Sequence, residues 1–241
     1  MPLAQPSGGL EELVDETSGK EIVATPVVIN RFEELTKKYE QYLNEADANQ
    51  TTLQIPSVLT PTECNTFLQS TNNYENHARY QGRTGLFVSK LIQCSYDAGY
   101  NDFKLDMNTL KSVDYLAYEI SGTKKRMLKV VIKGEVEYNC GYGAKHSTLT
   151  IEKAGDGCGH GAQYSTFIIE EVGDACGYGV QYSTFTIGKA EGWCGIGAEH
   201  SIFKTYNREQ YRQFKKFVDR RSANSVYLLS PNGSILKGGK W

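Results

Sequence analysis

An 18-residue repeat in the second half of the chain limits its possible folds more than any other feature. Each unit opens with C-G-x-G and continues with a small apolar residue and, two positions on, His or Tyr followed by Ser. The units begin at Cys140, Cys158, Cys176 and Cys194. Eighteen residues are too few for a helix-turn-helix repeat and suit one coil of a β-solenoid.

In each unit, the segment that follows the C-G-x-G opening and the His or Tyr predicts one β-strand per coil. In Ser147–Ile151 large apolar and polar residues alternate, as in a strand with one buried face. The serine and the large apolar residues are expected to point inward, and Thr148 and Thr150 outward. Because stacked coils lie about 4.8 Å apart, equivalent residues should form columns along the axis. The predicted interior columns are Leu149, Phe167, Phe185 and Phe203, with Ile151, Ile169 and Ile187.

Glycines and residue spacing narrow the type of solenoid. Thirteen of the 24 glycines lie between Cys140 and Gly197, where they would permit sharp corners. A left-handed hexapeptide helix needs an aliphatic residue at every sixth position, but steps of six from Ile151 reach Gly157 and Gln163. A calcium-binding nonapeptide roll needs an Asp that these units lack. A right-handed, glycine-rich β-helix with one strand per coil remains.

The C-G-x-G units within residues 128–205 resemble a known repeat family. They resemble the GXGXG β-helix domain of glutamate synthase large subunits and of the C subunit of formylmethanofuran dehydrogenase. They are also similar to uncharacterised repeat proteins with units of the type C-G-x-x-A-x-x-S-T-F-x-I. The resemblance implies a structural domain, because the enzymes that contain this domain carry out their chemistry in other domains. It therefore implies a structural accessory domain or subunit of a redox or amidotransferase-like enzyme complex.

The regions around the repeat are predicted to complete an α+β fold. Residues 1–20 are expected to be a disordered leader, and residues 21–127 a mainly helical domain. Residues 128–205 form the predicted solenoid. Residues 206–241 are expected to be a helix and a hairpin that cap its last coil. A cap is needed because an open coil end exposes an unpaired strand.

Local signals place the helices of the first half. An apolar stripe follows Asn30, a candidate N-cap, and Thr60–Glu63 is a capping box with proline in the first turn. Two further helices are expected from Thr84 or Gly85 and after Asn108, and Ile22–Ile29 fits a strand. In the C-terminal cap, the helix is expected at Arg208–Arg221 and the hairpin turn at Pro231–Gly233.

Composition excludes several classes of protein. The formal net charge is −2, unlike that of a dedicated nucleic-acid coat or a polybasic membrane binder. No apolar run is long enough to cross a membrane, and the first twenty residues lack the apolar core of a secretory signal. We therefore expect a cytoplasmic protein without membrane association, in which the six cysteines are not bridged.

The cysteine column is the first candidate site. Candidate metal ligands are Cys140, Cys158, Cys176, Cys194 and His160. Soft metals such as Zn²⁺ and Cu⁺ bind thiolates, but a zinc site gathers its ligands around a point, whereas a column spreads them along a line. We expect the cysteines to pack as small buried side chains without metal or cofactor. Because no nucleophile motif or phosphate-binding loop appears either, no catalytic residue and no enzymatic activity are predicted.

Aromatic columns and a basic helix are the other candidate surfaces. One column holds His146, Tyr164, Tyr182 and His200, and a second holds Tyr142, His160 and Tyr178. Such rings stabilise stacking or bind a ligand. Basic residues that could contact a nucleic acid or an acidic partner are Arg208, Arg212, Lys215, Lys216 and Arg220. The sequence favours a non-enzymatic scaffold that presents a rigid surface to a protein partner, with nucleic-acid binding and homo-oligomerisation left open.

Overall fold

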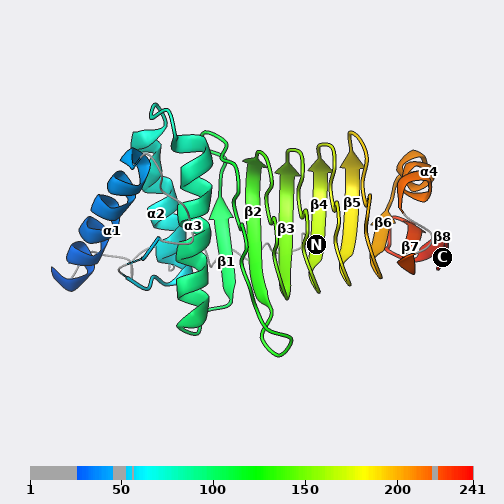
Figure 1. The fold of residues 1–241 in the computed structure, drawn as a ribbon, viewed down its shortest axis with the longest axis horizontal. Coiled ribbons are helices and arrows are strands. Elements are labelled where there is room, and N and C mark those ends of the chain that lie inside the picture. The colour runs from blue at the N-terminus through cyan, green and yellow to red at the C-terminus, as the bar shows by residue number, and fades with distance from the viewer. Residues whose placement is uncertain (1–25, 46–52, 56, 219–221, 241) are drawn as a thin grey trace, which may run out of the picture.

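The computed structural model describes residues 26–45, 53–55, 57–218 and 222–240. Its central element is an eight-stranded sheet whose strands follow one another in chain order. Neighbours from β1 to β7 are parallel, and β8 pairs antiparallel with β7. Figure 1 shows the strands in a row, with α1, α2 and α3 at one end and α4 at the other. The strands are β1 (Asp102–Asp106), β2 (Leu128–Val136), β3 (Ser147–Ala154), β4 (Thr166–Val172), β5 (Thr184–Ala190), β6 (Ile202–Thr205), β7 (Ser225–Leu229) and β8 (Ile235–Lys240).

The parallel strands belong to a β-solenoid of about four turns, which confirms the expected fold class. From β3 to β6 each residue pairs with the equivalent residue of the next unit, as in Leu149 with Phe167. The apolar residues at the inward positions of these pairs are buried, whereas Ile168, at an outward position, is 44% exposed. The rings of Phe167, Phe185 and Phe203 stack in sequence, with centroids 4.6 and 5.3 Å apart. The predicted alternation of inward and outward residues is therefore confirmed.

Glycine at the corner of each coil leaves room for these rings. Gly159 has a φ of +70°, and a Cβ on it would lie 2.8 Å from Cζ of Phe185. A side chain at this position would thus meet both backbone strain and a ring of the core. The segment from Ile132 to Cys140 is one residue longer than the equivalent segment from Ile151 to Cys158, and a register shift between Ile132 and Glu135 of β2 absorbs this extra residue.

Three helices cover the start of the sheet: α1 (Pro26–Asn44), α2 (Pro61–Ser70) and α3 (Tyr80–Asp97). The predicted capping box opens α2, because the Glu63 amide donates to Oγ1 of Thr60 and the Thr60 amide donates to the Glu63 carboxylate. The helices meet through buried aromatic rings. Phe67 of α2 lies 5.7 Å from Tyr39 of α1 and 5.5 Å from Phe87 of α3, between ring centroids.

Several local predictions for the first half are wrong. The first helix begins at Pro26, so Asn30 is not its N-cap, and the described part of Ile22–Ile29 is helical rather than extended. Helix α3 begins at Tyr80, ahead of Thr84. Gly85 serves close packing instead, since a Cβ there would lie 1.9 Å from the carbonyl oxygen of Asp114.

The prediction of a helix after Asn108 is also wrong. This segment forms turns of an irregular first coil, with the Glu119 amide donating to the Tyr142 carbonyl at 2.7 Å. The Gly141 amide donates to the Leu116 carbonyl at 2.8 Å. Pairing with the next coil satisfies these backbone groups, so no helix is needed. The parallel sheet thus begins at β1, before residue 128, and continues to β7, after residue 205.

The predicted C-terminal cap is confirmed as a helix and an antiparallel hairpin. Helix α4 (Arg208–Phe217) follows Asn207, whose side chain accepts hydrogen bonds from the amides of Glu209 and Gln210. Phe214 of α4 is buried, and its ring centroid lies 6.1 Å from that of Phe203 in the last coil. The cap therefore extends the solenoid core. The expected leader, residues 1–20, and Arg220 lie outside the described residues.

Candidate interaction surface

The four cysteines of the repeat lie in the core, where no solvent reaches them. Cys140, Cys158, Cys176 and Cys194 are free thiols with no exposed surface. His160, by contrast, is half-buried at the outer surface, where its ring lies tilted between those of Tyr142 and Tyr178. The structure thus separates His160 from the thiols. Within the described residues, no group of three or more His, Cys, Asp or Glu side chains is arranged to hold a metal ion.

The thiols interact along the column. A hydrogen bond with Cys158 and complete burial raise the pKa of Cys140, and burial raises that of Cys176. The S–H groups of these two neighbours hold the pKa of Cys158 below that of the cysteines on either side. A thiolate in this column would have no solvent around it, so the neutral column is a packing element.

A column of rings, exposed except for the half-buried His146, runs along one corner of the solenoid. It consists of His146, Tyr164, Tyr182 and His200, one from each unit. Successive ring centroids are 5.1, 5.0 and 4.8 Å apart, and the ring planes differ by 14°, 3° and 1°. The two tyrosines are 48% and 49% exposed. Because the rings stack face to face, they present mainly their edges, with hydroxyl groups and ring nitrogens, to solvent.

Each residue of this column has a left-handed backbone. The φ angles of His146, Tyr164, Tyr182 and His200 lie between 45° and 52°. Residues other than Gly, Asn and Asp rarely adopt this conformation, which costs about 1–2 kcal/mol for each. Stacking of each ring on the next offsets part of that cost. The fold therefore holds large rings at four equivalent positions of successive coils, where glycine or asparagine would be less strained.

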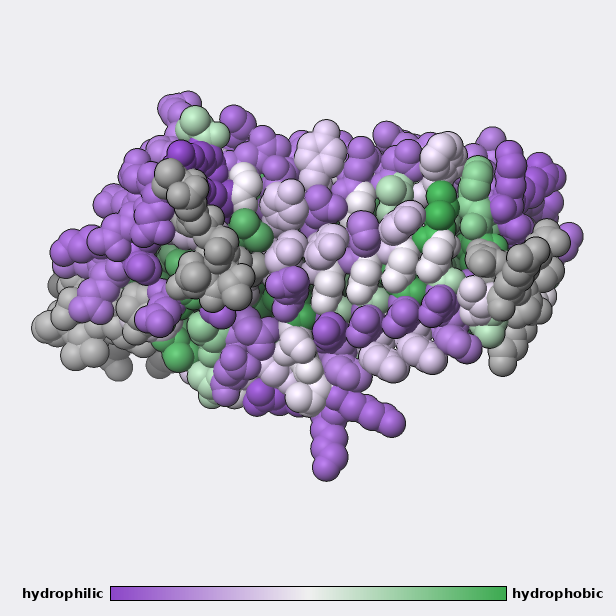
Figure 2. Space-filling model, viewed as in Figure 1, coloured by the Kyte–Doolittle hydropathy of each residue, from purple (hydrophilic) through white to green (hydrophobic). Residues whose placement is uncertain are grey.

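A second column begins one coil earlier than the sequence suggested. Tyr118 of the irregular first coil stacks on Tyr142 with centroids 5.2 Å apart, and His160 and Tyr178 follow at 4.8 and 4.9 Å. Burial and the adjacent Glu119 raise the pKa of Tyr118. Tyr118 was missed because its segment lacks the C-G-x-G pattern. Figure 2 shows the result of such stacking on one face, where side chains of similar hydropathy form rows along the long axis.

Buried serines fix the corner that carries the first aromatic column. The Ser147 amide donates to Oγ of Ser165 at 3.2 Å, and the Ser165 amide donates to Oγ of Ser183 at 3.2 Å. Each of these two acceptor hydroxyls also donates to a backbone carbonyl two residues before it. Each serine directly follows a ring of the first column, so these bonds hold the rings in a fixed register.

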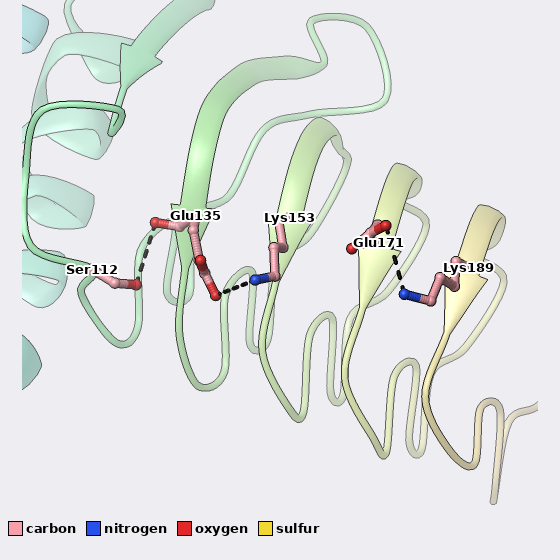
Figure 3. A network of polar contacts seen from close by, with 5 residues as sticks. All are labelled: Ser112, Glu135, Lys153, Glu171 and Lys189. Atoms are coloured by element: carbon pink, nitrogen blue, oxygen red, sulfur yellow. Dashed lines mark hydrogen bonds and ion pairs between the residues drawn. The ribbon is translucent and has the colours of Figure 1, made fainter.

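A row of alternating charges lies at the opposite end of the strands. In Figure 3, Glu135 of β2 points to Lys153 of β3, and Glu171 of β4 points to Lys189 of β5. The ion pairs measure 2.8 and 3.7 Å, and Glu135 raises the pKa of Lys153. The row borders a groove of about 280 Å³. The spacing of 18 residues between Lys153, Glu171 and Lys189 is visible in the sequence and could have identified the row. Exposed pairs of this kind add little stability and favour the stacking register.

The predicted basic contacts gather on α4. Arg208, Arg212 and Lys216 are exposed, and Lys215 is half-buried with its ammonium 5.7 Å from the Tyr211 ring centroid. Trp193, which the sequence analysis overlooked, is 56% exposed and packs on Phe217 of α4 at 5.8 Å. A basic and partly aromatic surface therefore covers this end of the molecule.

Comparisons with known proteins add no name to this arrangement. Comparison with protein-family models gave no match, and neither the curated proteins nor the solved structures gave one. Among the described residues, no helix combines the length and apolar character that crossing a membrane requires.

Proposed function

We propose that this protein is a non-enzymatic scaffold that binds a protein partner through its two aromatic columns. The observation that carries the proposal is the strained backbone of His146, Tyr164, Tyr182 and His200, whose rings stack at the surface with the last three exposed. Strained backbone held by its surroundings is typical of binding sites. Aromatic residues, tyrosine among them, are enriched in the buried centres of protein interfaces.

The rigidity of the corner supports binding over a purely structural role. The Tyr164 amide donates to the Gln181 carbonyl and the Tyr182 amide to the Glu199 carbonyl, both at 3.0 Å. The rings are thus ordered before a partner arrives, so association would cost little side-chain entropy. Hydroxyl groups and imidazole nitrogens at regular spacing offer a partner both donors and acceptors.

The resemblance of the units to the GXGXG repeat supports a structural role within a larger complex. A partner that is itself a redox or amidotransferase-like enzyme would make this chain its accessory subunit. The six free cysteines support a reducing, cytoplasmic location.

Asparagine offers a direct test, because it tolerates a left-handed backbone. We expect Tyr164→Asn combined with Tyr182→Asn to remove two rings without a loss of stability from backbone strain. The matched control is Tyr138→Asn with Tyr206→Asn, which removes two equally exposed tyrosines outside both columns.

Tagged wild-type and variant proteins would be compared by quantitative co-purification from native extracts. We expect at least one protein whose recovery falls about tenfold with the column variant and is unchanged with the control; such a fall corresponds to about 1.4 kcal/mol. A set of partners that is the same for all three proteins would contradict the proposal.

A further inference from the structure

The two edges of the sheet are finished in different ways. At the β1 edge, Asn65 of α2 accepts a hydrogen bond from the Asp106 amide at 2.9 Å. Gln69 of α2 donates to the carbonyl of the same residue. Helix α2 thus supplies partners for backbone groups of the first strand that would otherwise point into empty space.

The β8 edge has no such cover among the described residues. Strand β8 ends the sheet and pairs on one side with β7. Its first two residues, Ile235 and Leu236, are 61% and 59% exposed. A terminal strand with free backbone groups and exposed apolar side chains is a template for a further strand.

Charge argues against a second copy at this edge. Lys237 is exposed near the middle of β8, so a symmetric antiparallel pair of β8 strands would bring two lysines together. From residue 206 to the end, the sequence holds eight Lys or Arg and two Asp or Glu. The exposed Arg208 and Arg212 of α4 lie at the same end of the molecule (Figure 1).

We propose that the β8 edge binds an extended, acidic segment of a protein partner by strand addition. Backbone groups of the segment would pair with the free side of β8, its acidic side chains would lie near Lys237, and its apolar side chains would cover Ile235 and Leu236. This site lies apart from the aromatic columns and does not depend on their function.

The test uses the full chain and a blocked octapeptide of alternating Val and Glu as probe. Hydrogen exchange of the β8 amides would be measured by NMR. At a peptide concentration about ten times its Kd, the free-side amides should exchange about tenfold more slowly. The first control peptide has the same sequence with every backbone amide N-methylated, which keeps its charge but removes the donors on both of its edges. The second replaces Glu by Lys.

A matched pair of variants separates charge from backbone pairing. Lys237→Glu should weaken binding of the Glu peptide about tenfold and strengthen binding of the Lys peptide, whereas Lys133→Glu on the exposed face of β2 should do neither. Stronger binding of the Lys peptide by Lys237→Glu would show that this variant is still folded, although it binds the Glu peptide more weakly.

Three results would overturn the proposal. Protection of β8 by the N-methylated peptide equal to that by its parent would leave only general attraction between charges. Protection of β8 by a uridine oligonucleotide, without protection by the Glu peptide, would favour nucleic acid. Protection of β8 that grows with protein concentration alone would assign the edge to a second copy. Protection of the β8 amides by the Glu peptide, but by neither of the two control peptides, would support the proposal.

Discussion

The two ends of the solenoid solve the same physical problem with different means. At the N-terminal end a layer of three helices, built around Tyr39, Phe67 and Phe87, covers the first strand. At the C-terminal end the chain first forms a segment that is arranged like one more coil. Asn224 takes the place of the next serine, accepting from the Ser201 amide at 2.8 Å and donating to the Ala198 carbonyl at 2.7 Å.

The difference explains why one end is closed and the other is not. Helices satisfy their own backbone and can bury an edge with their side chains. A coil-like segment covers the core and forms hydrogen bonds with the last repeat, but it ends in a strand of its own. The antiparallel turn into β8 moves this open edge outward by one strand without removing it. The C-terminal end is therefore the end at which the molecule can be extended.

The largest effect is expected from removing the C-terminal cap. Deletion of residues 208–241 exposes Phe203, which the cap covers through Phe214, and leaves the outer side of β6 without a partner strand. The truncated protein should self-associate end to end, which light scattering after size-exclusion chromatography would detect. Deletion of residues 235–241 alone is the control, because it keeps α4 and β7. A stable monomer from the larger deletion would show that the core does not need this cap.

A large effect is also expected inside the coils that both ends protect. Gly159→Val should reduce the free energy of unfolding by about 2–5 kcal/mol, because a Cβ meets Phe185 and the backbone is left-handed. At Gly161, φ is +65° but no atom lies within 4 Å of a Cβ, so Gly161→Val should cost only the backbone strain, about 1–2 kcal/mol. Denaturant unfolding would measure both. Equal losses would show that the ring stack does not constrain the corner.

Regular and irregular parts of the chain differ in what the sequence reveals. An 18-residue spacing that repeats in the amino-acid sequence predicts the register of β3 to β6, the buried phenylalanines and the aromatic columns. The first coil could not be found in this way. Leu110, Val113 and Leu116 have a spacing that also fits a helix, and only pairing with a later coil decides against it. The left-handed backbone of Tyr164 and Tyr182 was hidden as well, because their residue type argues against it.

The polar closures of the two ends should differ in strength. Asn224→Ala removes two buried hydrogen bonds and should reduce the free energy of unfolding by about 1–3 kcal/mol. Asn65→Ala removes a half-buried bond to β1 and should cost about 1 kcal/mol or less. Denaturant titration of both variants would compare them directly. A larger loss at Asn65 would reverse the order and identify the helical end as the one that depends more on polar closure.

A similarly small effect is expected from a conservative change at the middle of the solenoid, far from both ends. Cys158→Ala removes one sulfur from a fully buried column and should cost about 1 kcal/mol, as expected for a small packed group. Cys158→Asp should cost several times more, because it places a carboxylate where no solvent reaches.

Thiol reactivity separates this packing role from metal binding or redox chemistry. Burial raises the pKa of Cys64 to about 11 and raises that of Cys176, and a hydrogen bond with Cys158 together with burial raises that of Cys140. These thiols should therefore react slowly in the native protein at pH 8. Cys94, which is half-buried, should react first with a disulfide reagent, and the remaining thiols only on unfolding. Rapid reaction of Cys158 in the folded state, or stoichiometric zinc or copper by elemental analysis, would contradict packing as its role. Either result would make the interior of the solenoid, rather than its open end, the chemically active part of the molecule.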